Sequence, residues 1–134
     1  MLQAKDIMTE DVISVKTGTP IYTAVELMAE NNITGIPVVE DDMTLVGILT
    51  EKDVLRLYYD RGSEAGKNVD DFMTQPAIFF SEKESLHDVC SCLVNNVFRR
   101  VPVVSGGKLV GIVSRKDIIC ECILRTRQEN ADSC

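Results

Sequence analysis

The sequence predicts an α+β fold built from two similar halves. The stretches GILTEKD at 47–53 and GIVSRKD at 111–117 are near copies of each other. In both, a glycine and a short apolar run are followed by a hydroxyl residue, two charged residues and an aspartate. This pattern is typical of a buried strand that runs into a helix N-terminus. The stretches DIMT at 6–9 and DFMT at 71–74 also match, so we interpret the chain as an internal duplication.

Each half is expected to form a strand, a helix, two strands and a second helix. The elements expected in the first half are a strand at 12–15, a helix that starts at Thr19-Pro20, strands at 33–39 and 45–49, and a helix at 51–59. Those expected in the second half are a strand at 77–80, a helix at 84–96, strands at 98–104 and 109–113, and a helix at 115–124.

The expected boundaries follow from residue chemistry. Thr19 is a candidate N-cap, and Pro20 suits the first helical position. Asparagine pairs at 31–32 and 95–96 end the first helix of each half, because asparagine tolerates the left-handed conformation found at helix ends. Turns at Asp41-Asp42 and at 105–107 join the last two strands of each half into hairpins.

The domain organisation follows from the repeat. We assign residues 4–62 to repeat 1, residues 67–124 to repeat 2 and residues 125–134 to a polar tail that is expected to be disordered. A three-stranded sheet with helices on one side leaves an apolar face that a unit of about 60 residues can hardly cover. The two repeats are therefore expected to pack sheet to sheet as a pseudo-symmetric pair.

Composition and charge limit the classes of function. Hydrophobic residues make up 45% of the chain without any tryptophan, which predicts an aliphatic core. No apolar run approaches the roughly 18 residues needed to span a bilayer, so we expect a cytoplasmic protein with no membrane partner. The net charge of −7 argues against nucleic-acid binding, and it arises in residues 1–66, which hold 5 Lys/Arg against 12 Asp/Glu.

The five cysteines do not indicate a metal site. Cys90 and Cys92, like Cys120 and Cys122, are two residues apart in expected helices, so the members of each pair point to different faces. We expect these four to be buried thiols that act as small apolar residues, and Cys134 to be a free thiol on the tail.

The two strand-to-helix junctions are the candidate functional feature. Thr50 and Ser114 are good N-caps, and the free N–H groups behind them form a local anion site. Asp53 and Asp117, three residues later, can either bond back to the cap as in a capping box or accept a bond from a ligand hydroxyl. Both alternatives stay open, although a capping box prefers Glu or Gln at that position.

These motifs resemble those of the cystathionine-β-synthase (CBS) domain. The resemblance rests on DIMT at 6–9, GIPVV at 35–39 and LVGILTEKD at 45–53, and the second copy matches in the same order. A tandem pair resembles the module called a Bateman domain, and the likeness covers about residues 4–124. It implies two clefts that often bind adenine nucleotides or S-adenosylmethionine. Each cleft would combine the threonine and first strand of one repeat with the Ser/Thr-x-x-Asp junction of the other.

The resemblance implies two sets of site residues. The first set is Thr9, Ile13, Ile33 and Thr34 with Arg99, Arg100, Ile112, Ser114 and Asp117. The mirror set is Thr74, Ile78, Phe98 and Arg99 with Ile48, Thr50 and Asp53. The isoleucines of the first set suit an adenine slot, Asp117 suits ribose hydroxyls, and the Arg99-Arg100 pair suits phosphate. Repeat 1 has Thr34-Gly35 in place of that pair, so the Asp117 site is expected to hold a phosphorylated nucleotide better.

Some of these residues also have simpler interpretations. The two arginines can lie on a solvated strand edge, and Phe98 can fill core instead of stacking on a base.

The function expected from this resemblance is regulatory. The chain would bind AMP, ADP, ATP or S-adenosylmethionine, require no cofactor, form a homodimer and signal to a separate protein in trans. An enzyme is not expected, because the chain has one histidine, no nucleophile with a recognisable base and no glycine-rich phosphate loop. The alternative is a dimeric interaction scaffold that binds no ligand.

Overall fold

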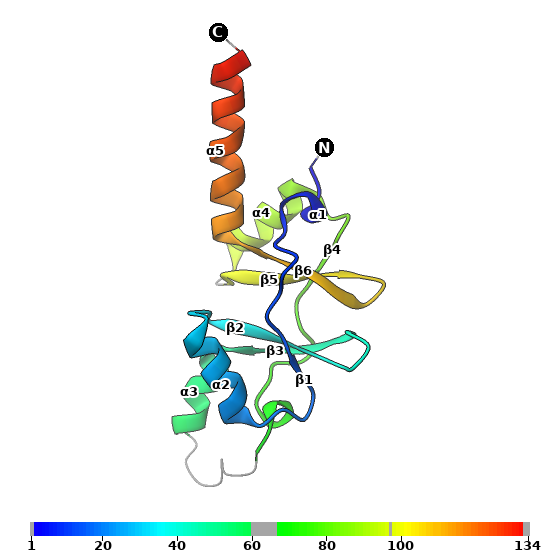
Figure 1. Cartoon of the computed structure of the whole chain (residues 1–134), viewed down its shortest axis with the longest axis vertical. Helices are drawn as coiled ribbons and strands as arrows, with labels where there is room; N and C mark the ends of the chain where they lie inside the picture. Colours follow the sequence, from blue (N-terminus) through cyan, green and yellow to red (C-terminus); the bar gives the residue numbers. More distant parts are fainter. Residues whose placement is uncertain (1, 60–66, 97, 133–134) are drawn as a thin grey trace. The chain divides into compact units, whose positions relative to one another are not determined.

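The computed structural model describes residues 2–59, 67–96 and 98–132. The polar loop at 60–66 and Cys134 lie outside the described residues. The chain divides into two compact units, each composed of segments from both repeats. We call residues 13–78 with 106–109 the Asp53 unit, and residues 1–12, 79–105 and 110–134 the Asp117 unit. Each repeat supplies a three-stranded sheet and helices, which confirms the predicted α+β fold (Figure 1). The sheet-to-sheet packing stays a prediction.

The Asp53 unit contains the first sheet and its helices. Its elements are β1 (Val15–Lys16), α2 (Ile21–Glu30), β2 (Gly35–Val39), β3 (Leu45–Thr50), α3 (Glu51–Tyr59) and the 3₁₀ turn η1 (Val69–Asp71). The strand order is β1-β2-β3, with β1 parallel to β2 and β2 antiparallel to β3. The β3 strand runs directly into α3, as the sequence predicts.

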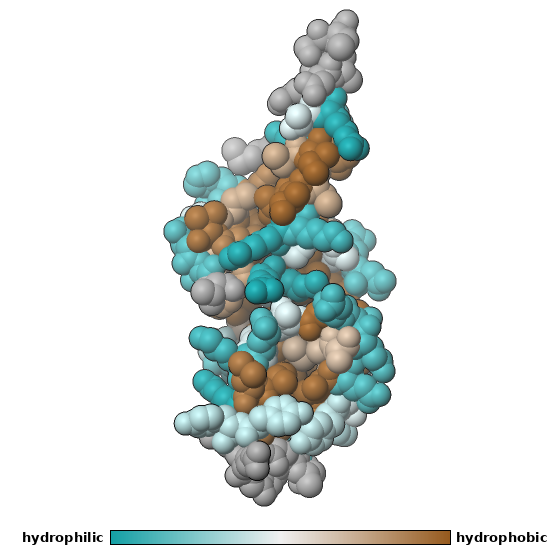
Figure 2. All heavy atoms as spheres, turned by 90° about the vertical axis from the view of Figure 1, so that its left-hand side faces the viewer, coloured by the Kyte–Doolittle hydropathy of each residue, from teal (hydrophilic) through white to brown (hydrophobic). Residues whose placement is uncertain are grey.

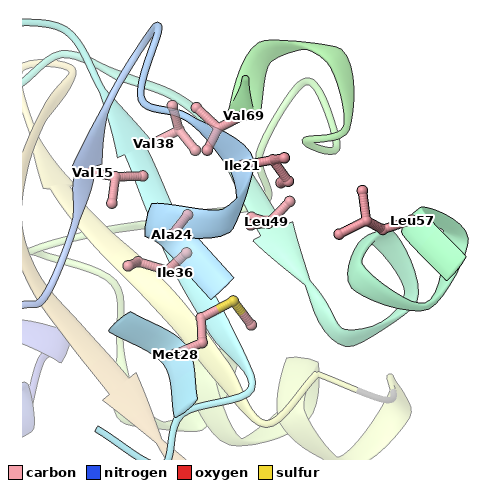
Figure 3. Close-up of a cluster of buried hydrophobic side chains, with 9 residues drawn as sticks. All are labelled: Val15, Ile21, Ala24, Met28, Ile36, Val38, Leu49, Leu57 and Val69. Atoms are coloured by element: carbon pink, nitrogen blue, oxygen red, sulfur yellow. The ribbon is translucent and has the colours of Figure 1, made fainter. Parts of the chain in front are cut away.

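The core of the Asp53 unit is aliphatic, as the composition predicts. Leu57 of α3 and Ile21 of α2 both point toward Leu49 of β3 (Figure 3). Burying one such side chain contributes about 1.5–3 kcal/mol, so this cluster holds both helices on the sheet. The buried members are Val15, Ile21, Ala24, Met28, Ile36, Val38, Leu49, Leu57 and Val69.

The Asp117 unit repeats this arrangement. Its elements are α1 (Ala4–Ile7), β4 (Phe80–Ser81), α4 (Leu86–Asn95), β5 (Arg100–Ser105), β6 (Lys108–Ser114) and α5 (Arg115–Asp132), and only the first two residues of β6, Lys108 and Leu109, belong to the Asp53 unit. The strand order is β4-β5-β6, with β4 parallel to β5. Its buried core is Ala4, Phe80, Val89, Leu93, Val101, Val103 and Val113.

The first strand of each repeat is shorter than predicted. Strands were expected at 12–15 and 77–80, whereas β1 begins at Val15 and β4 begins at Phe80. The preceding residues are engaged elsewhere, because Thr9 pairs with Ile112 in the Asp117 unit and Thr74 pairs with Ile48 in the Asp53 unit. Each chain segment passes from one unit to the other just before its strand, at residues 12–13 and 78–79, so these residues link the units instead of extending the strand.

Two predictions about helix ends were wrong. Pro20 is the N-cap of α2 instead of its first residue, and the Thr19 hydroxyl donates to the Lys16 carbonyl at 2.6 Å instead of capping the helix. Asn32 has the expected positive φ of 52°, but Asn96 is extended at −132°.

The last helix continues beyond the predicted end. A disordered tail was expected from residue 125, and the structure instead has α5 helical to Asp132. No glycine or proline interrupts residues 115–134, and Glu121 pairs with Arg125 one turn later at 3.3 Å. Helix formers such as Arg125, Arg127 and Gln128, which are exposed, therefore extend the helix.

The expectation of buried thiols was wrong for α5. Cys120 and Cys122 are exposed, whereas Cys90 and Cys92 of α4 are half-buried. The difference arises because α4 packs on the core of the Asp117 unit, and the part of α5 after Ile118 does not.

An ion pair connects the turn at Asp42 to the start of β6 within the Asp53 unit. Lys108 Nζ lies 2.7 Å from Asp42 Oδ2, and Leu45 N donates to the Gly107 carbonyl at 3.1 Å. The Lys108 ammonium group, together with Thr44, lowers the pKa of the Asp42 carboxyl far below its usual range. This pair is exposed, so the solvent screens it and it contributes little to stability.

The described residues form no helix that is both long enough and apolar enough to cross a membrane.

Two glycines allow the segments that open each repeat, around Thr9 and Thr74, to pass close to a strand. A Cβ added at Gly47 would lie 2.8 Å from both Met73 Sδ and the Thr74 carbonyl oxygen. A Cβ added at Gly111 would overlap the side chain of Met8 in the same way. Gly47 lies three residues before Thr50, and Gly111 lies three residues before Ser114. These close approaches therefore help to position Thr74 and Thr9, the threonines near the start of each repeat, which we call the opening threonines.

We predict that Gly47→Ala lowers the free energy of unfolding by about 1–3 kcal/mol, because the backbone at Thr74 cannot move away as a flexible side chain would. Urea denaturation measures the change. Gly35→Ala is the matched control in the neighbouring strand, where the added Cβ meets nothing nearer than Ile48 Cδ1 at 3.7 Å. Equal stability of the two variants would contradict the role assigned to Gly47.

Candidate functional site

The junction between β6 and α5 contains a reciprocal hydrogen-bonded cap. Ser114 donates to Asp117 Oδ2 through its backbone N–H at 2.7 Å and through its hydroxyl at 3.0 Å. The Asp117 N–H donates back to Ser114 Oγ at 3.3 Å. The capping interpretation of this motif is therefore confirmed, and it holds one carboxylate oxygen in place.

The other oxygen of Asp117 faces the start of the chain. The Thr9 hydroxyl donates to Asp117 Oδ1 at 3.2 Å. Thr9 and Ile112 also exchange two backbone hydrogen bonds of 2.9 Å, which position the threonine. The structure thus brings the opening threonine of repeat 1 to the junction of repeat 2. Asp117 is half-buried.

The junction between β3 and α3 has the same plan. Thr50 donates to Asp53 Oδ2 through its N–H and its hydroxyl, both at 2.8 Å. The Thr74 hydroxyl lies 3.2 Å from Oδ1 and 3.1 Å from Oδ2. Thr74 in turn exchanges backbone hydrogen bonds with Ile48 at 2.8 and 3.1 Å. Here the opening threonine of repeat 2 meets the junction of repeat 1.

The two aspartates differ in burial and in charge partners. Asp53 is only 2% exposed, and Arg56 Nη1 lies 3.9 Å from its Oδ1. The residue that corresponds to Arg56 in repeat 2 is Cys120, which carries no charge. The carboxylate of Asp53 is therefore enclosed by protein donors, and that of Asp117 is more open.

The remaining predicted site residues divide between the two units. In the first set, Ile13, Ile33 and Thr34 belong to the Asp53 unit, whereas Thr9, Arg99, Arg100, Ile112, Ser114 and Asp117 belong to the Asp117 unit. In the mirror set, Phe98 and Arg99 belong to the Asp117 unit, whereas Ile48, Thr50, Asp53, Thr74 and Ile78 belong to the Asp53 unit. The meeting of these groups in two clefts stays a prediction.

Several of these side chains also serve the cores of their own units. Ile33 packs against the core of the Asp53 unit, and Phe98 packs against that of the Asp117 unit, which agrees with the core interpretation of Phe98. Arg99 is exposed and Arg100 is half-buried. Both arginines lie at the start of β5, near the end of α4 in the chain.

Two residues at the junctions were not predicted from the sequence. Arg56 pairs with Asp53, and their i, i+3 spacing on a helix could have indicated this. Arg115 donates through Nη2 to the carbonyls of Leu93 at 3.2 Å and Asn96 at 3.3 Å. Because these carbonyls end α4, the guanidinium of Arg115 joins the end of that helix to the start of α5. No sequence spacing indicates the second contact.

The described residues include no group of three His, Cys, Asp or Glu side chains arranged to hold a metal ion.

Comparison with known proteins identifies the family. Residues 4–60 and 69–122 match the family model of the CBS domain, once for each repeat. The chain belongs to the CBS-domain family. The Ser/Thr-x-x-Asp junctions and the opening threonines described above are thus parts of a CBS pair.

Relatives and solved structures support the assignment. This CBS pair is 40% identical over 115 residues to an uncharacterised protein of Methanocaldococcus jannaschii, covering 86% of this chain and 41% of the relative. It is similar to the crystal structure of CBSX2 of Arabidopsis thaliana in complex with AMP, with 32% identity, a TM-score of 0.82 and coverage of 94% of this chain and 99% of that chain.

A further similar structure is the CBS domain pair of protein MJ0100 in complex with 5′-methylthioadenosine and S-adenosyl-L-methionine. It has 26% identity, a TM-score of 0.77 and coverage of 93% of this chain and 98% of that chain. The chain spans 41, 58 and 66% of the length of the first three curated relatives that it matches.

We predict that Asp53→Ala destabilises this CBS pair more than Asp117→Ala. Removing the buried Asp53 leaves Thr50 and Thr74 without their acceptor, which should cost about 2–3 kcal/mol. Removing the half-buried Asp117 should cost about 1 kcal/mol, the usual effect of losing a helix cap. Chemical denaturation of the two variants measures the difference, and equal losses would contradict the distinction.

Proposed function

We propose that this CBS pair is a regulatory module that binds an adenosine-containing ligand, either AMP, ADP, ATP or S-adenosylmethionine. The observation that carries the proposal is the pairing of Thr9 with Asp117, which joins the start of one repeat to the junction of the other. The similar structure at 32% identity contains AMP. The similar structure at 26% identity contains 5′-methylthioadenosine and S-adenosyl-L-methionine. Ligand occupancy would be read by a separate protein that is regulated in trans.

The Asp117 junction suits the sugar of such a ligand. Two adjacent ribose hydroxyls are donors, and an ionised carboxylate is a pure acceptor that can receive both. The reciprocal cap with Ser114 fixes one oxygen of Asp117 at 2.7 Å from a backbone N–H. The carboxylate is thereby oriented before a ligand arrives, which reduces the entropic cost of binding.

The other parts of the ligand need different chemistry. An adenine ring requires an apolar slot, which we assign to Ile13, Ile33 and Ile112 with Thr34 at its edge. A phosphate requires cations and free N–H groups, which we assign to Arg99 and Arg100. The equivalent site built on Asp53 would use Thr74, Ile78, Phe98 and Arg99 with Ile48 and Thr50. It lacks the arginine pair on the corresponding strand, so we expect weaker phosphate binding there.

We assign no catalytic role and no required cofactor, and we propose that the protein acts in the cytoplasm. The alternative is an interaction scaffold without a ligand. It is favoured by the apolar side chains exposed on two helices, which would serve an interface whether or not a ligand binds.

We also propose a homodimer formed through helices. On α3, Leu55 and Tyr58 are each 67% exposed, and Tyr59 is 88% exposed. They line a shallow hollow of about 540 Å³ with Lys52 and Arg56. On α5, the exposed apolar residues are Ile119, Ile123 and Leu124. Figure 2 shows hydrophobic side chains on the surface over helices of each unit.

A panel of AMP, ADP, ATP and S-adenosylmethionine tests ligand binding by thermal shift. Ligand at one hundred times its dissociation constant should stabilise the chain by about 2.7 kcal/mol. Arg99→Ala/Arg100→Ala should weaken AMP binding about tenfold or more through loss of charge-assisted hydrogen bonds, and should affect adenosine less. Lys83→Ala removes an exposed cation elsewhere and is the control. A flat response to all four compounds would leave only the scaffold.

Light scattering after size exclusion tests the dimer. We predict a dimer for the native chain and a shift toward monomer for Leu55→Glu/Ile119→Glu, because two charges would enter the apolar interface. Met43→Glu changes an exposed apolar residue of a turn and is the control. A monomeric native chain at micromolar concentration would exclude both the dimer and the scaffold alternative.

A further inference from the structure

We infer that Arg115 is a positioning residue for the phosphate contact. Its guanidinium occupies the carbonyl end of α4, which leaves the side chains of Arg99 and Arg100 free for a phosphate. Arg115 itself does not touch the ligand. The inference rests on the proposed function and adds to it a residue, on a different element, that keeps the phosphate contact ready.

Arg115 bonds to the chain on both sides of the connection between α4 and β5. Its Nη2 donates to the Leu93 carbonyl at 3.2 Å and to the Asn96 carbonyl at 3.3 Å. Its backbone N–H donates to the Arg99 carbonyl at 3.2 Å. All of these residues belong to the Asp117 unit. Because one residue bonds to both groups, the end of α4 and the backbone of the first arginine lie close together.

The end of α4 would oppose an anion if no cation covered it. The unpaired carbonyls of the last helical turn carry together about half a negative charge. The Leu93 carbonyl belongs to that turn, since α4 ends at Asn95. Without the cation of Arg115, these carbonyls would repel a phosphate. They would also attract the side chain of Arg99, which is exposed and follows them closely in the chain.

Repeat 1 closes the equivalent helix in another way. At the end of α2, the Ile33 N–H donates to the Met28 carbonyl at 3.0 Å. The residue equivalent to Arg115 is Glu51, whose carboxylate cannot donate to a carbonyl when it is ionised. An acidic residue suits the first turn of a helix, whereas a cation there opposes the helix dipole. Arg115 is thus unfavourable for its own helix, which agrees with a role at the end of α4.

Titration calorimetry of the full chain with AMP and with adenosine tests the inference. Adenosine lacks the phosphate, so the ratio of the two dissociation constants reports the phosphate contact. We expect the native chain to bind AMP about tenfold or more tightly than adenosine. In Arg115→Ala this preference should fall about threefold or more, because the helix end is no longer compensated. The affinity for adenosine should stay the same, because Arg115 does not touch the nucleoside.

Further variants separate the charge of Arg115 from a general effect on the fold. Arg115→Lys keeps a cation at the end of α4 and should retain most of the preference for AMP. Arg115→Gln keeps N–H donors without the charge, so its preference should fall as in Arg115→Ala. Lys116→Ala is the matched control, because it removes the same charge from the next residue, which is exposed. Thermal unfolding establishes that each variant is folded, and the Gln and Lys variants decide the question if Arg115→Ala does not fold.

The outcomes separate the inference from the proposed function. An unchanged AMP preference in Arg115→Gln, an equal loss for AMP and adenosine, or an equal fall in Lys116→Ala would overturn the inference and leave nucleotide binding intact. Binding of S-adenosylmethionine without binding of AMP would do the same. If the native chain binds none of AMP, ADP, ATP and S-adenosylmethionine, the proposed function is overturned, and the inference with it.

Discussion

The hydrogen bond from an opening threonine to the aspartate of the other repeat is the contact on which the junctions depend. Thr9 meets Asp117 and Thr74 meets Asp53, and each threonine is held by two backbone hydrogen bonds to a strand. To form these pairs, the segment at Met73-Thr74 passes close to Gly47, and the segment at Met8-Thr9 passes close to Gly111. The glycine and the threonine of each repeat therefore act together with the buried residues of the same segments, Ala4 in one unit and Val69 in the other, to hold the segment in its unit.

Duplication preserved this geometry and allowed the surroundings to diverge. The reciprocal cap is present at both junctions, since the same residue types recur there. The two aspartates differ in burial and in charged neighbours. Arg56 lies beside Asp53, whereas the equivalent residue in repeat 2 is the uncharged Cys120. The carboxylate is enclosed by the protein at Asp53 and is more exposed at Asp117.

A regulatory role is consistent with this construction. The opening segment of each repeat ends at the atoms that we assign to the ribose, so a bound sugar would act directly on a segment that joins the two repeats. A ligand changes a conformational equilibrium only if it makes different contacts in the two states. Under the proposed function, competition between a ribose hydroxyl and the Thr9 hydroxyl for Asp117 would provide such a difference. Membership in the CBS-domain family and the AMP-bound structure of a relative agree with this role.

The sequence by itself determined the duplication, the α+β class, the aliphatic core of the Asp53 unit and the capped junctions, because these depend on spacing, on hydrophobic pattern and on residue type. Only the tertiary structure decided that the first strands are short and that Arg115 contacts the carbonyls that end α4. Periodicity cannot predict such features, because they depend on which distant segments meet. The burial of Asp53 relative to Asp117 belongs to the same class, since similar Ser/Thr-x-x-Asp junctions are buried to different extents in the folded chain.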